Sequence, residues 1–546
     1  MTAKLAAAPS QDVAVQREKT LPQLLAERAQ ATPDRLFLQD ADGPSLTYGQ
    51  TYELALRWAG ALRAAGVRPG DRVATLLDNC LESPVMWLAL SILGALEVSI
   101  STAYRGTLLT HALTVSEARV LFADSTVLEA LGMIISDVPV LETVIVRGAG
   151  DGTLPKLPVA VHREEDLLDP GQPIVPGPPP SGHDIACVVF TSGTTGPSKG
   201  ALVPWAAVAA GTMTLTGALT GDDVIYHMAA ANHLIARVHV LATAQLGGGI
   251  VLKRAFRTQE FWSDIDRFGC TYTTLVGAMA HFIMSQPETE GDADHPLAKV
   301  NISPVHPRLE ELRRRFGIQD VLTAYGSTEV PSPINTGWKG IDAIGSCGRV
   351  ASGWPGWVLR IVDEHDEEVA PGEVGELMVR TEAPWTIAVG YLGMPQESAT
   401  AWRNGWFHTG DAFRQDTEGR FYFVDRIKDA IRRRGENISS FEVEMEVNTH
   451  PDVAESAAVA VPAEGAEDEI KVFVVPVAGR SVDPEDLVRY LIPRMARYMV
   501  PRYVELIEEL PKTPTLRVKK VELRQRTPGE VWDRVAAGVE IPKKTA

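Results

Sequence analysis

Short apolar strands alternate with helical stretches along most of this chain, and this alternation restricts the fold more than any other feature of the sequence. Apolar runs typical of strands lie at residues 73–77, 98–100 and 120–123, and helical patterns lie between them at residues 84–96 and 107–116. Parallel strands need a long crossover connection, which is usually a helix. Strands that alternate with helices therefore predict an α/β fold with parallel sheets covered by helices.

Other segments indicate how the chain is organised. Residues 21–68 are expected to be helical on both sides of a turn at residues 33–35. The segment DPGQPIVPGPPPSGH, residues 169–183, holds too much proline and glycine for a helix or a central strand and predicts a surface connection. Strand candidates at residues 358–362 and 374–379 are joined by the turn-rich DEHDEEVAPGE, which predicts a β-rich subdomain.

The pattern changes after Asp425, where a small α+β domain is expected. A basic loop is followed by a helix, two strands and a second helix, at residues 441–448, 454–461, 470–475 and 484–495. A chain of 546 residues is long enough for several domains. The predicted division is a large N-terminal domain of helix-covered sheets that includes the β-rich subdomain, residues 1–425, then a hinge, residues 426–429, and a small C-terminal domain, residues 430–546.

Charge and apolar patterning argue against several classes of function. The chain carries 70 acidic and 52 basic residues, and a formal net charge of −18 repels phosphate backbones, so nucleic-acid binding is not expected. The longest apolar stretch, residues 85–100, is shorter than the roughly 20 residues of a membrane span and is interrupted by Glu97. Residues 1–12 lack the apolar run of a signal peptide, and the four cysteines lie far apart. We therefore expect a cytoplasmic protein with reduced thiols.

The strongest local signal is the segment TSGTTGPSKG, residues 191–200, directly after an apolar strand. Small residues let backbone N–H groups surround an anion, while hydroxyl groups and a lysine add donors and positive charge. The segment is not a Walker A loop, because no lysine follows directly after its glycines. A flexible surface loop is the alternative to a phosphate-binding loop. The predicted phosphate-binding residues are Thr191, Ser192, Gly193, Thr194, Thr195, Gly196 and Lys199.

From this loop onward the sequence resembles the adenylate-forming superfamily of acyl-CoA synthetases, luciferases and peptide-synthetase adenylation domains. The resemblance extends over roughly residues 20–525, and text around residues 261–297 is more similar to the carnitine/crotonobetaine-CoA ligase branch than to the luciferase branch. Five further segments match the family's motifs in order: AYGSTE at residues 324–329, GWFHTGD at 405–411, DRIKD at 425–429, RGENI at 434–438 and PKTPTLR at 511–517.

The resemblance implies that the first motifs bind ATP. Glu329 would hold Mg²⁺, Thr328 would contact a phosphate, and Tyr325 with Gly326 would lie beside adenine. The alternatives are a solvated loop acid for Glu329 and ordinary core packing for Tyr325. Two further residues, Asp411 and Arg426, would bind the ribose hydroxyl groups.

The resemblance also implies a two-step cycle in which a mobile C-terminal domain rotates about the hinge residue Lys428. The loop Gly435, Glu436 and Asn437 would then reach the CoA channel. The last motif departs from the family, because Arg517 stands where relatives carry a lysine that contacts the carboxylate and the α-phosphate. Arginine keeps the charge but presents a planar fork, so the contact geometry differs. Arg517 is the predicted catalytic residue, and the neighbouring Lys519 or Lys520 is the alternative.

Asn232 and His233 fall where relatives carry an aromatic–histidine pair near the carboxylate pocket, so a substrate pocket is predicted from Asn232, His233 and Gly326. A core or helix-cap role is the alternative for His233. The resemblance implies a ligase that forms acyl-AMP and pyrophosphate from a carboxylic acid and ATP, after which the CoA thiol displaces AMP.

The expected cofactors and partners are therefore ATP, Mg²⁺, coenzyme A and a small carboxylic acid of the fatty or aryl type. No nucleic acid and no integral membrane segment are expected, and a homodimer is the expected assembly if the chain associates. Two alternatives remain open. One is an acid-adenylating enzyme that passes the acyl group to a carrier protein or an amine. The other is a degenerate nucleotide-binding homologue, which the arginine at position 517 suggests.

Overall fold

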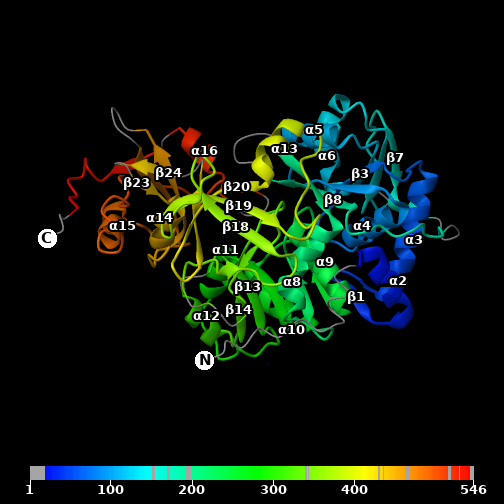
Figure 1. Cartoon of the computed structure of the whole chain (residues 1–546), viewed down its shortest axis with the longest axis horizontal. Helices are drawn as coiled ribbons and strands as arrows, with labels where there is room; N and C mark the ends of the chain where they lie inside the picture. The colour runs from blue at the N-terminus through cyan, green and yellow to red at the C-terminus, as the bar shows by residue number, and fades with distance from the viewer. Residues whose placement is uncertain are drawn as a thin grey trace.

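The chain forms two large sheets, an antiparallel β-rich layer and a separate group of C-terminal elements (Figure 1). The structure is a computed structural model. It describes residues 19–150, 154–168, 173–191, 198–305, 308–338, 341, 343–427, 431–433, 436–462, 468–513, 518–527 and 529–541. Within these ranges no helix has the length and apolar character that crossing a membrane requires.

The first large sheet has seven strands in the order β7-β6-β5-β3-β4-β8-β9. All neighbours are parallel except β8 and β9, which form an antiparallel hairpin. Its strands are β3 (Arg72–Leu76), β4 (Leu96–Ser99), β5 (Val120–Asp124), β6 (Thr143–Arg147), β7 (Ala160–Arg163), β8 (Ile185–Thr191) and β9 (Lys199–Pro204). The helices along this part of the chain are α4 (Glu82–Leu93), α5 (Gly106–Ser116), α6 (Leu128–Ile134) and α7 (Glu164–Leu167). The predicted α/β class is confirmed.

The second large sheet has the order β14-β13-β12-β10-β11-β1-β2, and only its last pair is antiparallel. Its strands are β1 (Leu36–Asp40), β2 (Ser45–Thr47), β10 (Val224–His227), β11 (Gly249–Leu252), β12 (Tyr272–Val276), β13 (Lys299–Ser303) and β14 (Asp320–Leu322). The helices along this part of the chain are α2 (Leu21–Ala31), α3 (Tyr48–Ala64), α8 (Trp205–Thr216), α9 (Leu234–Leu246), α10 (Thr258–Phe268), α11 (Gly277–Met284) and α12 (Leu309–Arg315).

The expectation of helix on both sides of a single turn in residues 21–68 is wrong for the stretch that forms β1 and β2. Leu38 pairs with Ile250 of β11 and is fully buried, so the second sheet captures this short apolar run as a strand. The strand partner lies far downstream in the chain. A reading of local helical pattern therefore could not detect it.

A buried ion pair connects the two halves of the large domain. Glu97 on β4 and Arg237 on α9 are each 1% exposed, and Arg237 Nη2 lies 2.7 Å from Glu97 Oε1. Thr75 Oγ1 donates a further hydrogen bond of 2.9 Å to the carboxylate. The guanidinium carbon lies 5.2 Å from the ring centroid of Trp87, which is in cation–π range. Both charges are therefore compensated inside the largest apolar core, which contains side chains from both sheets.

An antiparallel four-stranded sheet, β18-β19-β20-β21, forms the predicted β-rich layer. A three-stranded sheet of short strands precedes it in the chain. The elements are β15 (Ala324–Tyr325), β16 (Ile334–Asn335), β17 (Arg349–Val350), β18 (Trp357–Val362), β19 (Val374–Thr381), α13 (Pro395–Ala401), β20 (Phe407–Gln415) and β21 (Phe421–Arg426).

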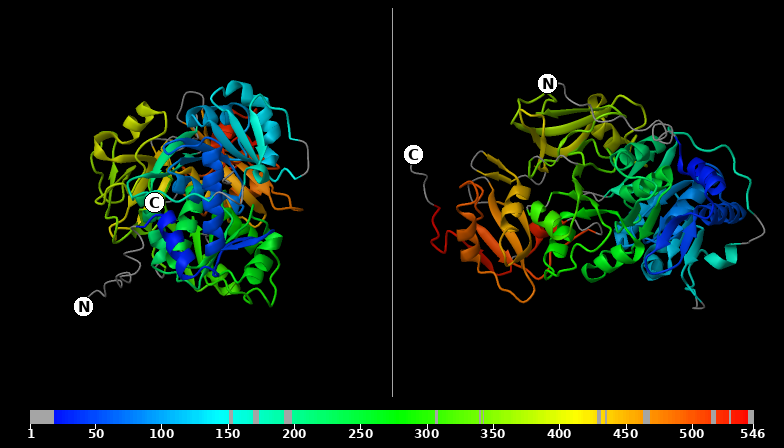
Figure 2. Two further views of the ribbon diagram at one scale, coloured as in Figure 1. Left: turned by 90° about the vertical axis from the view of Figure 1, so that its right-hand side faces the viewer. Right: turned by 90° about the horizontal axis from the view of Figure 1, so that it is seen from below.

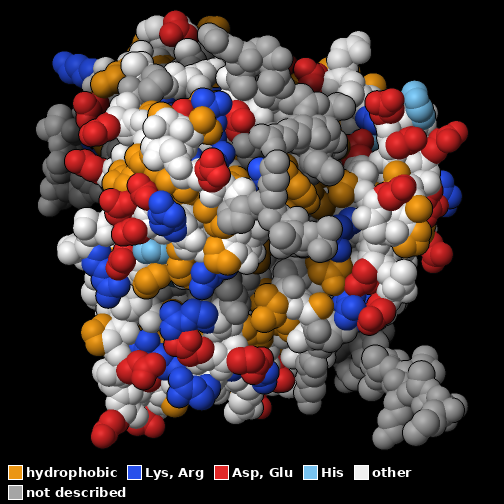
Figure 3. All heavy atoms as spheres, turned by 90° about the vertical axis from the view of Figure 1, so that its left-hand side faces the viewer, with side chains coloured by type: hydrophobic (Ala, Val, Ile, Leu, Met, Phe, Trp, Pro, Cys, Tyr) orange, Lys and Arg blue, Asp and Glu red, His pale blue; other side chains and the backbone are white. Residues whose placement is uncertain are grey.

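The C-terminal elements gather at one end of the molecule, opposite the first sheet (Figures 1 and 2). Acidic and basic side chains are interspersed over the described part of this end (Figure 3). The contact with β21 is direct, because Ser440 N donates to Asp425 Oδ2 over 2.7 Å. The elements are β22 (Ile431–Arg433), β23 (Glu436–Ile438), α14 (Ser440–Val447), β24 (Val453–Val461), β25 (Glu469–Pro476), α15 (Pro484–Leu491), β26 (Tyr503–Leu506), α16 (Lys520–Gln525) and β27 (Val531–Asp533).

Candidate active site

The predicted phosphate loop connects the last two strands of the first sheet. Thr191 ends β8, Lys199 begins β9, and the two residues face each other in the antiparallel pairing. Thr191 Oγ1 donates to the Lys199 carbonyl over 3.3 Å. The hairpin therefore holds both ends of the loop together. The remaining predicted loop residues, Ser192, Gly193, Thr194, Thr195 and Gly196, lie outside the described residues.

The exit of the loop is anchored by side chains from α5 and the segment before it. Ser198 is 4% exposed, and its hydroxyl group lies 2.8 Å from the hydroxyl of Tyr104. The ring of His111 lies 3.0 Å from the Ser198 carbonyl through Nε2. These contacts fix the backbone directly before Lys199.

Lys199 and Glu329 meet through a third side chain, Tyr391, which the sequence did not single out. The Lys199 ammonium lies 4.9 Å from the centroid of the Tyr391 ring, and the Tyr391 hydroxyl donates to Glu329 Oε1 over 2.9 Å. Burial raises the pKa of the Tyr391 phenol, and the Glu329 carboxylate raises it further, so the phenol stays protonated. Backbone pairing of Tyr391 with Ala201 on β9 sets this position. No local sequence motif predicts this position of Tyr391.

Glu329 stands in a tight turn after β15. Ser327 N donates to the Val330 carbonyl over 3.1 Å, and Ser327 Oγ accepts from Glu329 N over 3.2 Å. Gly326 is required here because a Cβ would lie 2.5 Å from Ser332 N. Within this turn Thr328 and Glu329 are 9% and 8% exposed, so the turn holds both side chains close to the protein interior.

The predicted ribose residues form a second cluster at the other end of the same turn. Asp411 Oδ2 accepts from the Tyr325 hydroxyl over 2.6 Å, and Arg426 Nε lies 3.2 Å from Asp411 Oδ1. Asp411 and Arg426 are paired residues of β20 and β21. Burial and the Asp411 charge together raise the pKa of the Tyr325 phenol, which therefore remains a donor. The Tyr325 ring packs edge-on against Phe413 at 4.7 Å between centroids.

The predicted acid-pocket residues lie at the start of α9. His233 is the N-cap residue of this helix, and its Nδ1 accepts from Ile235 N over 3.5 Å, which is the helix-cap geometry left open by the sequence. Asn232, directly before it, is 9% exposed.

Two further imidazoles, not recognised in the sequence, are buried nearby, with Nδ1 of His227 2.9 Å from Nδ1 of His239. Burial lowers the pKa of His227 to about 3, with the charges of His233 and Arg237 adding to the effect. Burial lowers the pKa of His239 as well. Both rings are therefore neutral at physiological pH.

The predicted residues of the C-terminal part lie mostly outside the described residues. Arg517, Lys428 and Gly435 lie outside the described residues, and Glu436 and Asn437 are described only as backbone of β23. Of the two lysines considered as substitutes for Arg517, Lys519 pairs with Glu522 over 2.8 Å. Lys520 pairs with Glu444 on α14 over 2.7 Å. Both ammonium groups thus have acidic partners within the C-terminal elements.

The Glu329 carboxylate at the turn fits a magnesium ion that is coordinated mainly by phosphate oxygens. Within the described ranges, no group of three or more His, Cys, Asp or Glu side chains could hold a metal ion. Mg²⁺ at nucleotide sites is usually bound by one or two carboxylates, water and substrate phosphates. Glu329 supplies such a carboxylate, and Tyr391 is the one described side chain that donates to it.

Comparison with known protein families identifies the family of this chain. A family model described as AMP-binding enzyme matches residues 25–392, and a model described as AMP-binding enzyme C-terminal domain matches residues 442–516. The chain is 31% identical over 523 residues to sulfoacetate–CoA ligase from Cupriavidus necator, covering 92% of this chain and 97% of that protein. It is 28% identical over 488 residues to crotonobetaine/carnitine–CoA ligase from Escherichia coli, covering 86% and 91%.

Solved structures show the same fold. The anthranilate CoA ligase AuaEII in complex with anthranoyl-AMP has a TM-score of 0.83 at 23% identity and covers 93% of this chain and 97% of its own. ATP-bound MatB from Rhodopseudomonas palustris has a TM-score of 0.77 at 25% identity, with coverage of 92% and 98%. The resemblance inferred from the motifs is confirmed by these matches. The chain belongs to the AMP-binding enzyme family, and the relatives named above are CoA ligases.

Proposed function

We propose that this chain is an ATP-dependent ligase that joins a carboxylic acid to coenzyme A through an acyl-AMP intermediate, with release of pyrophosphate and AMP. One observation carries the proposal. The short turn that begins with Tyr325 and ends with Glu329 connects the Asp411–Arg426 cluster with the Lys199–Tyr391 cluster. A ribose-binding cluster and a phosphate-binding cluster at the two ends of one turn suit a nucleoside triphosphate.

The chemistry requires positioning and charge compensation rather than a nucleophilic side chain. The substrate carboxylate attacks the α-phosphorus, the bond to the pyrophosphate oxygen breaks, and the leaving pyrophosphate gains negative charge. The Lys199 ammonium and the Thr328 hydroxyl bind phosphate oxygens, and Arg517 neutralises the charge that develops between carboxylate and α-phosphate. Mg²⁺ held by Glu329 would add charge neutralisation at the phosphates. Asp411 and Arg426 hold the ribose and thereby fix the α-phosphate.

The proposed acid is small and carries a second polar or charged group. The two curated relatives above act on sulfoacetate and on crotonobetaine or carnitine, which are acids of this kind. The polar side chain of Asn232, directly before the N-cap residue of α9, supports a polar acid. The proposed polar acid therefore differs from the fatty or aryl acid expected from the sequence. A cytoplasmic location and a homodimer remain predictions.

The test is a pyrophosphate-release assay with a panel of acids, followed by measurement of the thioester with coenzyme A. Release with a small polar acid and CoA-dependent thioester formation are the expected results. Release without a thioester would favour transfer to a carrier protein or an amine. Absence of release with every acid, while ATP still binds, would favour the degenerate nucleotide-binding homologue.

Replacing the proposed metal ligand should separate catalysis from folding. We expect Glu329→Gln to slow pyrophosphate release about 10- to 100-fold, because the neutral amide weakens Mg²⁺ at the phosphates. The melting temperature should change little, since the amide oxygen can still accept from Tyr391. Glu364→Gln, at a carboxylate with an 87% exposed side chain, is the matched control and should leave the rate unchanged. Normal adenylation by Glu329→Gln would assign the metal to another residue.

The proposed domain cycle predicts opposite defects for two variants. Lys428→Pro fixes φ at the hinge and should impair thioester formation while acyl-AMP accumulates. Arg517→Ala should slow adenylation and leave thioester formation from supplied acyl-AMP nearly intact. Rapid-quench measurement of both half-reactions distinguishes them. Loss of the same half-reaction in both variants would contradict domain rotation with these roles.

A further inference from the structure

The proposed ribose-binding residue Asp411 stands on a β-bulge. In the pairing of β19 with β20, three residues of β20, residues 409–411, lie opposite the single residue Leu377. Gly410 at the centre of the bulge has φ of 70°, a conformation that glycine adopts without strain. A bulge re-aims the side chains that follow from it, and bulges are common beside active sites. The direction of the Asp411 carboxylate therefore depends on how this bulge is held.

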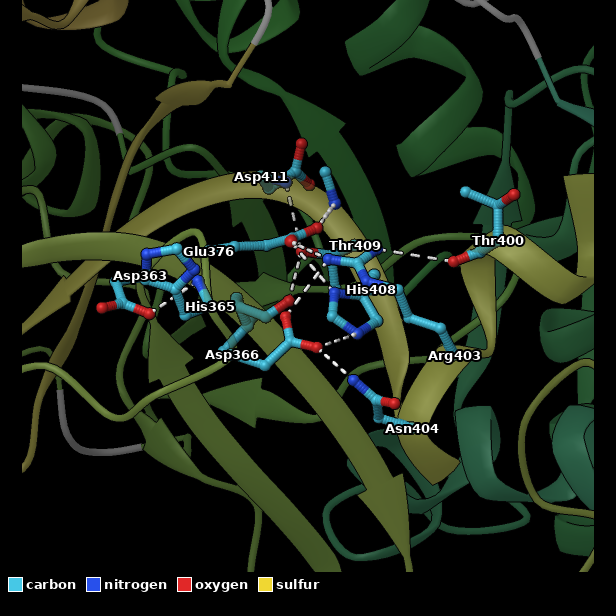
Figure 4. A network of polar contacts seen from close by, with 12 residues as sticks. Asp363, His365, Asp366, Glu376, Thr400, Arg403, Asn404, His408, Thr409 and Asp411 are labelled. Atoms are coloured by element: carbon cyan, nitrogen blue, oxygen red, sulfur yellow. Dashed lines mark hydrogen bonds and ion pairs between the residues drawn. The ribbon is translucent and has the colours of Figure 1, made fainter.

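Glu376 holds the bulge from the neighbouring strand (Figure 4). Its Oε1 accepts from the Gly410 amide over 2.9 Å, and its Oε2 lies 3.0 Å from Nδ1 of His408. The side chains of Glu376 and His408 are 15% and 2% exposed. Since an ionised carboxylate is only an acceptor, the His408 Nδ1 carries the proton and donates. One carboxylate thus connects a buried imidazole with the backbone directly before Asp411.

A further layer of charges surrounds this carboxylate. Arg403 Nη2 lies 3.4 Å from Glu376 Oε2 and 3.2 Å from Asp366 Oδ1. Nε2 of His408 lies 3.8 Å from Asp366 Oδ2, so the imidazole stands between two carboxylates (Figure 4). Asn404 also donates to Asp366. Arg403 thus contacts Glu376 directly, and Asp366 is connected to Glu376 through Arg403 and His408.

We propose that His408 and Glu376 are positioning residues for nucleotide binding, which lock the bulge so that Asp411 points at the ribose hydroxyl groups. The inference rests on the ribose role of Asp411 in the proposed function. His408 orients Glu376, Glu376 fixes the Gly410 amide, and the fixed amide sets the Asp411 carboxylate. A purely structural brace would stabilise the sheet but would not distinguish nucleotides with and without ribose hydroxyl groups.

The test compares two nucleotides and four variants of the full chain. The Asn amide nitrogen can occupy the place of imidazole Nδ1, whereas the Gln amide reaches the place of Nε2. His408→Ala and His408→Gln should therefore lose the bond to Glu376, and His408→Asn should recover most of it. His365→Ala, at a histidine with a 75% exposed side chain, is the matched control. AMP and 2′,3′-dideoxy-AMP binding is measured by calorimetry, and KM and kcat for ATP are measured by pyrophosphate release.

We expect His408→Ala to raise the Kd for AMP and the KM for ATP about tenfold, the effect of one weakened charge-assisted contact, with kcat within about twofold. The same substitution should change the Kd for 2′,3′-dideoxy-AMP by less than about twofold, since that ligand lacks the ribose hydroxyl groups that Asp411 would bind. His408→Asn should restore AMP binding, and His408→Gln should not.

Equal losses for both nucleotides, or a lowered melting temperature with unchanged AMP binding, would overturn the positioning role. If the unsubstituted protein binds both nucleotides equally, the ribose role of Asp411 and the inference fail together. If the protein binds AMP selectively but forms no acyl-AMP with any acid, the proposed ligase function fails while the calorimetric comparison still decides the inference.

Discussion

Lys199→Ala is expected to slow acyl-adenylate formation by about 10²- to 10³-fold, which is the usual effect of removing one charged donor from a site of developing negative charge. Lys199 begins β9 and faces Thr191 across the hairpin, so its position is set by the sheet and survives truncation of its side chain. The melting temperature should therefore stay close to that of the unsubstituted protein. Pyrophosphate release at varied ATP concentration measures the effect.

Two companion variants test whether Tyr391 presents Lys199 to the phosphates. Tyr391→Phe keeps the ring beneath the ammonium and removes only the bond to Glu329, so it should cost less than Tyr391→Leu, which removes both contacts. Lys156→Ala, at an exposed lysine, is the charge-matched control. Unchanged ATP kinetics in Lys199→Ala would remove this residue from the phosphate site.

Arg237→Leu is expected to destabilise the protein by about 3–5 kcal/mol, because it leaves the Glu97 carboxylate buried without its counter-charge. Glu97→Gln should destabilise the protein by a similar amount, because it leaves the Arg237 guanidinium buried without its counter-charge. Chemical denaturation followed by tryptophan fluorescence measures the free energy of unfolding of both variants.

The double variant Glu97→Met with Arg237→Met shows whether the stability lost in the single variants comes from an uncompensated buried charge or from lost packing. Two apolar side chains of similar length remove both desolvation costs, so the double variant should be more stable than either single variant. Strictly additive losses would show that the two charges do not compensate each other. Arg489→Met with Glu485→Met, in an exposed pair 2.6 Å apart, is the control and should change stability little.

The strand–helix alternation could be predicted from the sequence for most of the large domain. The expected strands at residues 120–123 and 374–379 correspond to β5 and β19. The failure at β1 has a physical cause. Leu38 is a strand residue because Ile250 offers it a hydrogen-bonded neighbour, and without that neighbour the local pattern favoured helix.

The candidate nucleotide-binding residues could be predicted from the sequence because each lies within a short local motif. Tyr325 and Glu329 belong to one hexapeptide, and Asp411 follows a recognisable run of residues. The sequence predicted roles for these side chains but not that Tyr325 would donate to Asp411, since this contact joins two distant motifs.

The sequence by itself determined the α/β class, the family and the order of the nucleotide motifs, because each depends on residues that are neighbours in the chain. Only the tertiary structure decided which side chains support those motifs. Tyr391 reaches Glu329 across 62 residues, and Arg237 reaches Glu97 across 140. Glu376 reaches the amide before Asp411 across 34 residues. Such partners are set by the packing and register of whole sheets, and no local pattern of residues encodes the identity of a partner on another strand.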